Sequence, residues 1–106
     1  MSNILFICSK NQWRSPTAEV LFKNHPLHIA KSAGTGSNAR IKLNHKLIVW
    51  ADIIYVMERK HKDLLRLRFS DAITDKRIEV LNIPDKYSFQ DPKLIKILRS
   101  ALAEYL

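Results

Sequence analysis

The chain has 106 residues, which suits one compact domain over residues 1–106 and is too short for two ordinary ones. Its composition, with 46% hydrophobic and 26% charged residues, is globular and excludes a largely disordered chain. The net charge of +8 is uneven, because residues 1–50 carry +6 and residues 51–106 carry +2. This surplus in the N-terminal half predicts an anionic partner, either a phosphorylated molecule or a nucleic acid.

The chain has one cysteine, Cys8, at the end of an apolar run that is too short for a signal peptide or a membrane span. We therefore expect a cytoplasmic protein with no membrane partner. A lone cysteine cannot form an internal disulfide, so Cys8 is available for packing or for chemistry. No metal and no cofactor are expected, since the four histidines show no metal-ligand spacing: His25, His28, His45 and His61.

Residues 3–8 form a short apolar run that is typical of a buried parallel strand. A helix should follow it, because Ser15 is a suitable N-cap and Pro16 suits the first helical position. The sequence Asn-His-Pro at residues 24–26 is expected to end this helix.

The rest of the chain continues to alternate strands with helices. The last helix has the clearest signal, since Asp91 is a suitable N-cap, Pro92 follows it, and apolar residues recur on one face. Further strands are expected at residues 27–33, 53–57 and 78–83, and further helices at residues 39–50, with Asn38 as candidate cap, and 58–69.

This alternation, without internal repeats, implies an α/β fold with a parallel sheet covered by helices on both faces. We expect three layers, α/β/α, around a four-stranded parallel sheet in the order 2-1-3-4. Ligands in such folds bind beyond the carboxyl ends of the strands, where the strand order reverses. Cys8 ends the first strand and should lie at that edge.

The segment CSKNQWRSP, residues 8–16, joins the first strand to the first helix. Backbone N–H groups that converge at a helix N-terminus can hold a phosphoryl group, and Arg14 can clamp two of its oxygens. The same donors would stabilise a Cys8 thiolate, which favours attack on phosphorus and a phosphocysteine that water later hydrolyses. Cys8 alone also fits a small core residue, but its position between a strand and a helix start favours the chemistry.

The segment resembles the N-terminal signature C-x-G-N-x-C-R-S-P of the low-molecular-weight protein tyrosine phosphatase family. The resemblance continues in Ser-Ala-Gly-Thr at residues 32–35 and in ADIIYVMERKHKDLL at residues 51–65, in the same order along most of the chain. The signature positions that match are Cys8, Asn11, Arg14, Ser15 and Pro16.

The resemblance implies metal-independent hydrolysis of a phosphomonoester, with Cys8 as nucleophile and Arg14 as phosphate clamp. It also implies that Ser15 donates a hydrogen bond to the thiolate and that Asn11 holds the loop in shape. The expected partner is a phosphotyrosine-containing protein or a small aryl phosphate, and the chain is expected to be a monomer or weak dimer. The expected phosphate-binding residues are Ser9, Lys10, Asn11, Gln12, Trp13, Arg14 and Ser15.

The chain looks like a short, atypical member of the family. Lys10 replaces the loop glycine, so either this position does not need a glycine-only conformation or the loop differs. Trp13 replaces the second loop cysteine, which excludes a disulfide within the loop. Trp13 either forms a hydrophobic wall beside the phosphate or packs elsewhere.

Two aspartates compete for the general acid that protonates the leaving oxygen. The family supplies this acid from an Asp-Pro-aromatic motif after the fourth strand. Asp91-Pro92 matches the dipeptide but lacks the aromatic residue, and a helix cap already explains Asp91. Asp85 is preferred, because it is nearer the strand end and Tyr87 follows it two positions later.

Two other classes of function remain open. A phosphotransfer domain also carries phosphate on a cysteine at a strand end, but Arg14 at this offset favours hydrolysis. A non-catalytic phosphate-binding module is the second alternative. Nucleic acid is not the expected partner, because the basic helix at residues 58–69 has no accompanying aromatic RNA-binding signature.

Overall fold

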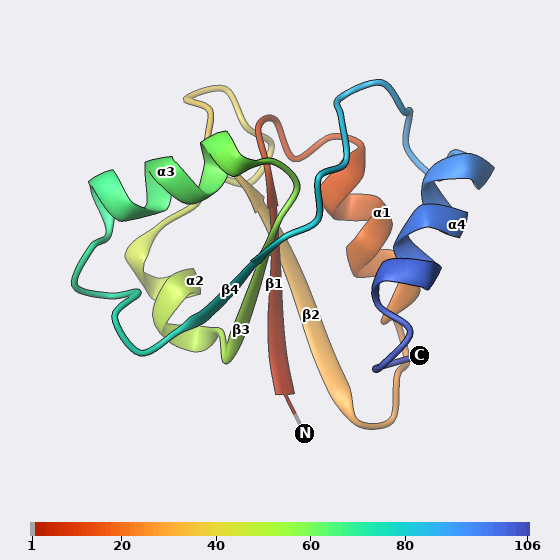
Figure 1. Ribbon diagram of the computed structural model, residues 1–106, viewed down its shortest axis with the longest axis horizontal. Helices are drawn as coiled ribbons and strands as arrows, with labels where there is room; N and C mark the ends of the chain where they lie inside the picture. Colours follow the sequence, from red (N-terminus) through yellow and green to blue (C-terminus); the bar gives the residue numbers. More distant parts are fainter. Residues whose placement is uncertain (1) are drawn as a thin grey trace.

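The computed structural model describes residues 2–106, and within them strands and helices alternate along the chain (Figure 1). The elements are β1 (Ser2–Cys8), α1 (Arg14–Leu21), β2 (His28–Gly34), α2 (His45–Trp50), β3 (Ile53–Val56), α3 (Arg59–Arg68), β4 (Arg77–Val80) and α4 (Pro92–Ala101).

The four strands form one parallel sheet in the order β2-β1-β3-β4, which confirms the predicted fold class and strand order. β1 lies in the interior of the sheet, where Cys8 pairs with Gly34 of β2 and Ile7 pairs with Val56 of β3. Because all strands run the same way, their carboxyl ends meet at one edge. Cys8 is the last residue of β1 and therefore lies at this edge. Figure 1 shows the chain turning from the end of β1 into α1.

The period of two along β1 divides its side chains between two cores, one on each face of the sheet. Ile4, Phe6 and Cys8 pack in a cluster with residues of α1 and α4, including Ala18 and Leu98. The residues between them pack in a second cluster with α2 and α3. Figure 1 shows the same division, with α1 and α4 on one side of the sheet and α2 and α3 on the other.

The start of α1 differs from the prediction, since Ser15 is not its N-cap. The N-cap position is Trp13, whose side chain makes no capping hydrogen bond, and the backbone N–H of Thr17 donates to the Trp13 carbonyl at 3.1 Å. The helix therefore begins at Arg14, which leaves the buried Ser15 hydroxyl free of a capping role. Pro16 falls in the first turn, where its missing N–H has no helical acceptor to lose.

The predicted helix over residues 39–50 is also wrong in its first half, and Asn38 is not its cap. Asn44 caps the shorter α2, because its side chain accepts a hydrogen bond from the Leu47 N–H at 2.9 Å. The segment before it is held to β2: the Gly34 N–H donates to the Ile41 carbonyl at 2.8 Å. The chain before α2 is thus hydrogen-bonded to the end of β2 and does not form the helix that the apolar spacing predicts.

α4 begins as predicted, with the Asp91 carboxylate accepting a hydrogen bond from the Lys93 N–H at 2.8 Å and Pro92 at the first helical position. Leu94 and Leu98 are fully buried on its inner face, and so is Leu102, the C-cap residue. None of the helices within residues 2–106 is both long enough and apolar enough to span a membrane.

A glycine is needed at position 34 because there is no room for a side chain, and not because of its backbone conformation. A Cβ at this position would lie 2.5 Å from the Ser9 carbonyl oxygen and 2.7 Å from the Ala39 Cβ, whereas a Cβ at Gly36 would lie 3.1 Å from the same Ser9 oxygen. We expect Gly34→Ala to lower the free energy of unfolding by about 1–3 kcal/mol, because the backbone must shift. Gly36→Ala is the matched control and should cost clearly less. Urea unfolding of both variants measures the difference, and an equal cost would contradict the assigned contact.

Candidate active site

The loop after β1 curls around the Cys8 sulfur. The backbone N–H of Asn11 points to Sγ at 3.3 Å, and Asn11 has a φ of 55°. This left-handed conformation is one that asparagine tolerates better than most residues. Lys10 is not among the residues with a positive φ. This position therefore does not need a conformation that only glycine adopts, and a lysine can replace the family glycine.

Cys8, Ser15 and Asn11 form a buried hydrogen-bonded chain. Ser15 Oγ lies 2.9 Å from Cys8 Sγ, and the Asn11 side-chain amide donates to Ser15 Oγ at 2.9 Å. Because Ser15 Oγ accepts that bond, its own proton is free to point at the sulfur, with the Ala33 carbonyl a more distant acceptor at 3.4 Å. The hydroxyl therefore has the geometry that the resemblance implies.

The chain of hydrogen bonds continues away from the sulfur into β2 and α1. The Asn11 amide also donates to Ser32 Oγ at 2.9 Å, and the Ser32 hydroxyl donates in turn to the Glu19 carboxylate. Ser32 and Glu19 were not predicted as site residues. Ser32 stands in the Ser-Ala-Gly-Thr segment, which was the available signal, whereas nothing in the sequence links Glu19 to this loop.

Arg14 is almost completely buried, with 2% of its surface exposed, and two segments hold its guanidinium. Its Nη1 donates to Glu58 Oε1 at 2.5 Å, just before α3, and to the Ile83 carbonyl at 2.8 Å, after β4. Its Nε lies 3.7 Å from Asp85 Oδ1. Burial alone would raise the pKa of Glu58, but the hydrogen bond and charge of Arg14 outweigh it and lower that pKa.

His61 is fully buried behind the loop, and its tautomer follows from its two partners. Its Nδ1 accepts a hydrogen bond from the Glu58 N–H at 3.0 Å, so Nε2 carries the proton and donates to Ser9 Oγ at 2.9 Å. Burial, with the charge of Arg14, lowers the pKa of His61 to about 4. A neutral His61 therefore holds the first residue of the loop. This role of His61 was not predicted, because Ser9 is 52 residues away and no spacing in the sequence links the two.

The loop and the segment after β4 enclose a small cavity of about 10 Å³ beside the sulfur. Asp91 does not line this cavity and instead caps α4. Tyr87 packs against the hydrophobic cluster between the sheet and the helices α1 and α4. Trp13 stands at the rim with 40% of its surface exposed. The six lining residues are Cys8, Lys10, Gln12, Trp13, Arg14 and Asp85.

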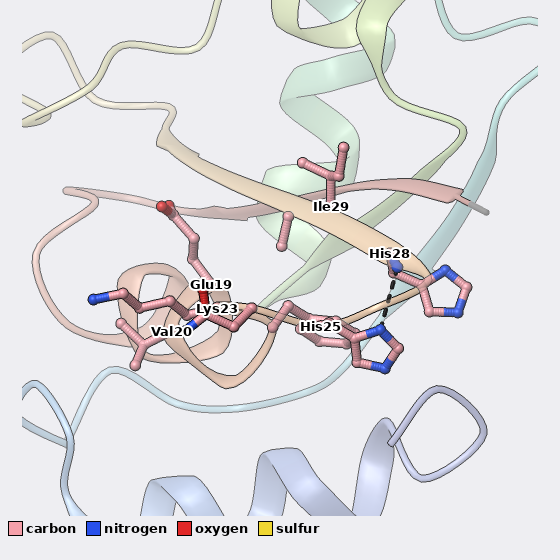
Figure 2. Close-up of a pocket in the computed structure, with 9 residues that line it drawn as sticks. Glu19, Val20, Lys23, His25, His28 and Ile29 are labelled. Atoms are coloured by element: carbon pink, nitrogen blue, oxygen red, sulfur yellow. Dashed lines mark hydrogen bonds between the residues drawn. The ribbon is translucent and has the colours of Figure 1, made fainter.

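A larger cavity of about 510 Å³ lies elsewhere, between α1 and the start of β2 (Figure 2). There the His28 N–H donates to His25 Nδ1 at 3.2 Å, the hydrogen bond drawn in Figure 2. No residue of the loop around Cys8 lines this cavity. Within residues 2–106 no group of three or more His, Cys, Asp or Glu side chains is arranged to hold a metal ion.

The chain matches the family model of the low molecular weight phosphotyrosine protein phosphatases over residues 3–48. No curated protein matches it. Among solved structures, the YwlE arginine phosphatase from Geobacillus stearothermophilus is 27% identical with a TM-score of 0.66, over 99% of this chain and 86% of that chain. Wzb from Escherichia coli K30, solved with phosphate, is 23% identical with a TM-score of 0.77, over 99% and 96%. A YwlE mutant from Bacillus subtilis is 20% identical with a TM-score of 0.75, over 98% of each chain.

The family match covers the loop around Cys8, and the structural similarity extends over the whole sheet and its helices. The chain thus resembles the low-molecular-weight phosphotyrosine phosphatases, in sequence over residues 3–48 and in fold over nearly its whole length. The resemblance drawn from CSKNQWRSP is confirmed, and so is the prediction of a phosphatase that acts through a cysteine.

The low pKa of His61 predicts how stability depends on pH. An unfolded His61 titrates near 6.5 and the folded one near 4, so below pH 6.5 the unfolded chain takes up a proton that the folded chain does not. Stability should therefore fall as the pH drops from about 6.5 to about 4, by on the order of 3 kcal/mol in total. His61→Gln removes this titration. Urea unfolding between these pH values should give a flatter profile for the variant, and parallel profiles would contradict the assignment.

Proposed function

We propose that residues 1–106 form one cytoplasmic, metal-independent phosphatase domain that removes phosphate from phosphotyrosine in a protein or from a small aryl phosphate. The observation that carries the proposal is the shared cavity, in which the side chains of Cys8, Arg14 and Asp85 meet. Each of the three comes from a segment at the carboxyl edge of the sheet, where parallel α/β folds bind their ligands.

The proposed reaction has two steps. The Cys8 sulfur attacks phosphorus and the bond from phosphorus to the leaving oxygen breaks, while a carboxylic acid gives that oxygen its proton. Water then attacks the phosphocysteine, the carboxylate takes up the proton of the water, and the thiolate leaves as phosphate is released. Arg14 and the backbone N–H groups of residues 9–15 stabilise the charge on the phosphoryl oxygens in both steps.

Asp85 is the proposed acid. Its carboxylate lines the cavity beside Cys8 and lies 3.7 Å from Arg14 Nε, with 41% of the side chain exposed to solvent. Asp91 accepts a hydrogen bond from the backbone of α4, a role that already accounts for its presence. Both observations favour Asp85, the aspartate that sequence reasoning also prefers.

An aryl substrate is favoured over other phosphomonoesters by Trp13, whose indole lines the cavity and is partly exposed at its rim. Wzb from Vibrio vulnificus, which is 23% identical, was solved with benzylphosphonate, an aromatic compound. The Geobacillus stearothermophilus neighbour is an arginine phosphatase, so phosphoarginine is the competing substrate that a test must include.

The first test measures hydrolysis of p-nitrophenyl phosphate by the wild type and by Cys8→Ser. Turnover should fall by at least about a thousandfold in the variant, since no other residue provides the nucleophile. Acid-quenched wild type should contain a phosphocysteine that decays at the turnover rate. Equal or absent turnover in both proteins would favour the binding module, and a phosphocysteine that persists without an acceptor would favour the phosphotransfer domain.

Faster hydrolysis of a phosphoarginine peptide than of its phosphotyrosine counterpart would overturn the proposed substrate.

The second test separates the two aspartates. Asp85→Asn should lower kcat for p-nitrophenyl phosphate by about a hundredfold or more and flatten the alkaline side of its pH profile, because a proton donor is lost. Asp91→Asn is the matched control and should leave both nearly unchanged, since asparagine is also a good N-cap. An unaffected Asp85 variant would show that the acid lies elsewhere.

A further inference from the structure

A second cavity adjoins the site and shares Gln12 and Trp13 with the cavity around Cys8. Its volume is about 360 Å³, against about 10 Å³ for the cavity beside the sulfur. We call it the flanking groove. Its lining residues are Gln12, Trp13, Pro16, Glu19, Val20, Arg40 and Phe89.

Apolar side chains from separate parts of the chain line the flanking groove and remain exposed. Trp13 is 40% exposed, Val20 on α1 is 37% exposed, and Phe89 in the segment before α4 is 47% exposed. The Phe89 segment is held against α1, because the Gln90 N–H donates to Thr17 Oγ1 at 3.0 Å. An aromatic side chain that a fixed backbone keeps out of the core is available to a ligand.

The charge of the groove comes mainly from Arg40. Its Nε donates to the Asn11 carbonyl at 3.0 Å, which holds the guanidinium at the outer side of the phosphate-binding loop. Glu19 also lines the groove, but its carboxylate accepts the Ser32 hydroxyl and is partly buried. Glu19 is also the only acid among residues 1–50, which carry +6. The surroundings therefore attract an acidic partner.

We infer that the flanking groove binds the polypeptide next to the phosphorylated residue of a protein substrate. An apolar side chain of that polypeptide packs between Trp13, Val20 and Phe89, and an acidic side chain lies at Arg40. The shared rim of Gln12 and Trp13 supports this occupant, since a chain whose phosphate reaches Cys8 must cross it. The inference rests on the proposed function, because it names what surrounds the phosphate in the substrate.

The test compares three phosphotyrosine peptides that differ only beside the phosphorylated residue: one with leucine and glutamate, one with serine for leucine, and one with lysine for glutamate. Each kcat/KM is divided by the value for p-nitrophenyl phosphate, so that a general loss of activity cancels. The wild type should prefer leucine over serine by about fivefold or more. Phe89→Ala and Val20→Ser should each reduce this preference, and Arg40→Gln should reduce the preference for glutamate over lysine. Leu67→Ala is the matched control, since Leu67 is 80% exposed on α3 and does not line the groove.

The failure of the groove and the failure of the proposed function give different results. Equal normalised values for the leucine and serine peptides, with turnover that depends on Cys8, would overturn the groove and leave the phosphatase standing. Absent turnover of every aryl phosphate would overturn the proposed function itself. Fluorescence polarisation with labelled peptides on Cys8→Ser tests the groove independently of turnover. Adding Phe89→Ala to the Cys8→Ser variant should weaken its binding of the leucine peptide. An unchanged dissociation constant would also overturn the proposed role of the groove.

Discussion

The site depends on one buried cation. A guanidinium with 2% of its surface exposed must have its charge and its donors satisfied inside the protein, because water is not there to do so. Glu58 supplies the charge and Ile83 a carbonyl, so the start of α1 is tied to the segments that follow β3 and β4. These segments are the ones that bring His61 and Asp85 to the loop. Burying Arg14 therefore brings the segments around Cys8 together, in addition to the role of phosphate clamp that we propose for it.

The loop around Cys8 is shaped by a second set of buried polar groups. Asn11 adopts the left-handed conformation and its amide donates to Ser15 and Ser32, while neutral His61 donates to Ser9. These hydrogen bonds hold the loop in one conformation before a substrate binds. This preorganisation is what a site needs if it is to stabilise a charged transition state without rearranging. It also explains why the loop accommodates Lys10, since the conformational demand falls on Asn11.

Sequence reasoning succeeds where the signal is local. Alternation of short apolar runs with helical periodicity predicts the sheet and its layers, and the cap at Asp91 is predicted correctly because aspartate followed by proline favours a helix start through local geometry alone. It fails at Ser15 and Asn38, two suitable cap residues that do not cap. Ser15 is drawn instead to the Cys8 sulfur and the Asn11 amide, and the chain after Asn38 pairs with Gly34. In both places a specific hydrogen-bonding partner in the folded loop outweighs the helix-capping preference of the residue.

From the sequence alone we predict the fold class and single out Cys8 and Arg14 as candidate site residues, because the strand, the cysteine, the loop and the helix start lie within a few consecutive residues. The distant side chains that surround them are known only from the folded structure. Glu58, His61 and Asp85 are far from Cys8 along the chain. They meet Arg14, Ser9 and the cavity beside Cys8, respectively, because parallel strands end at a common edge. The flanking groove likewise exists only in the folded chain, since Trp13, Arg40 and Phe89 line it together although they are far apart in the sequence.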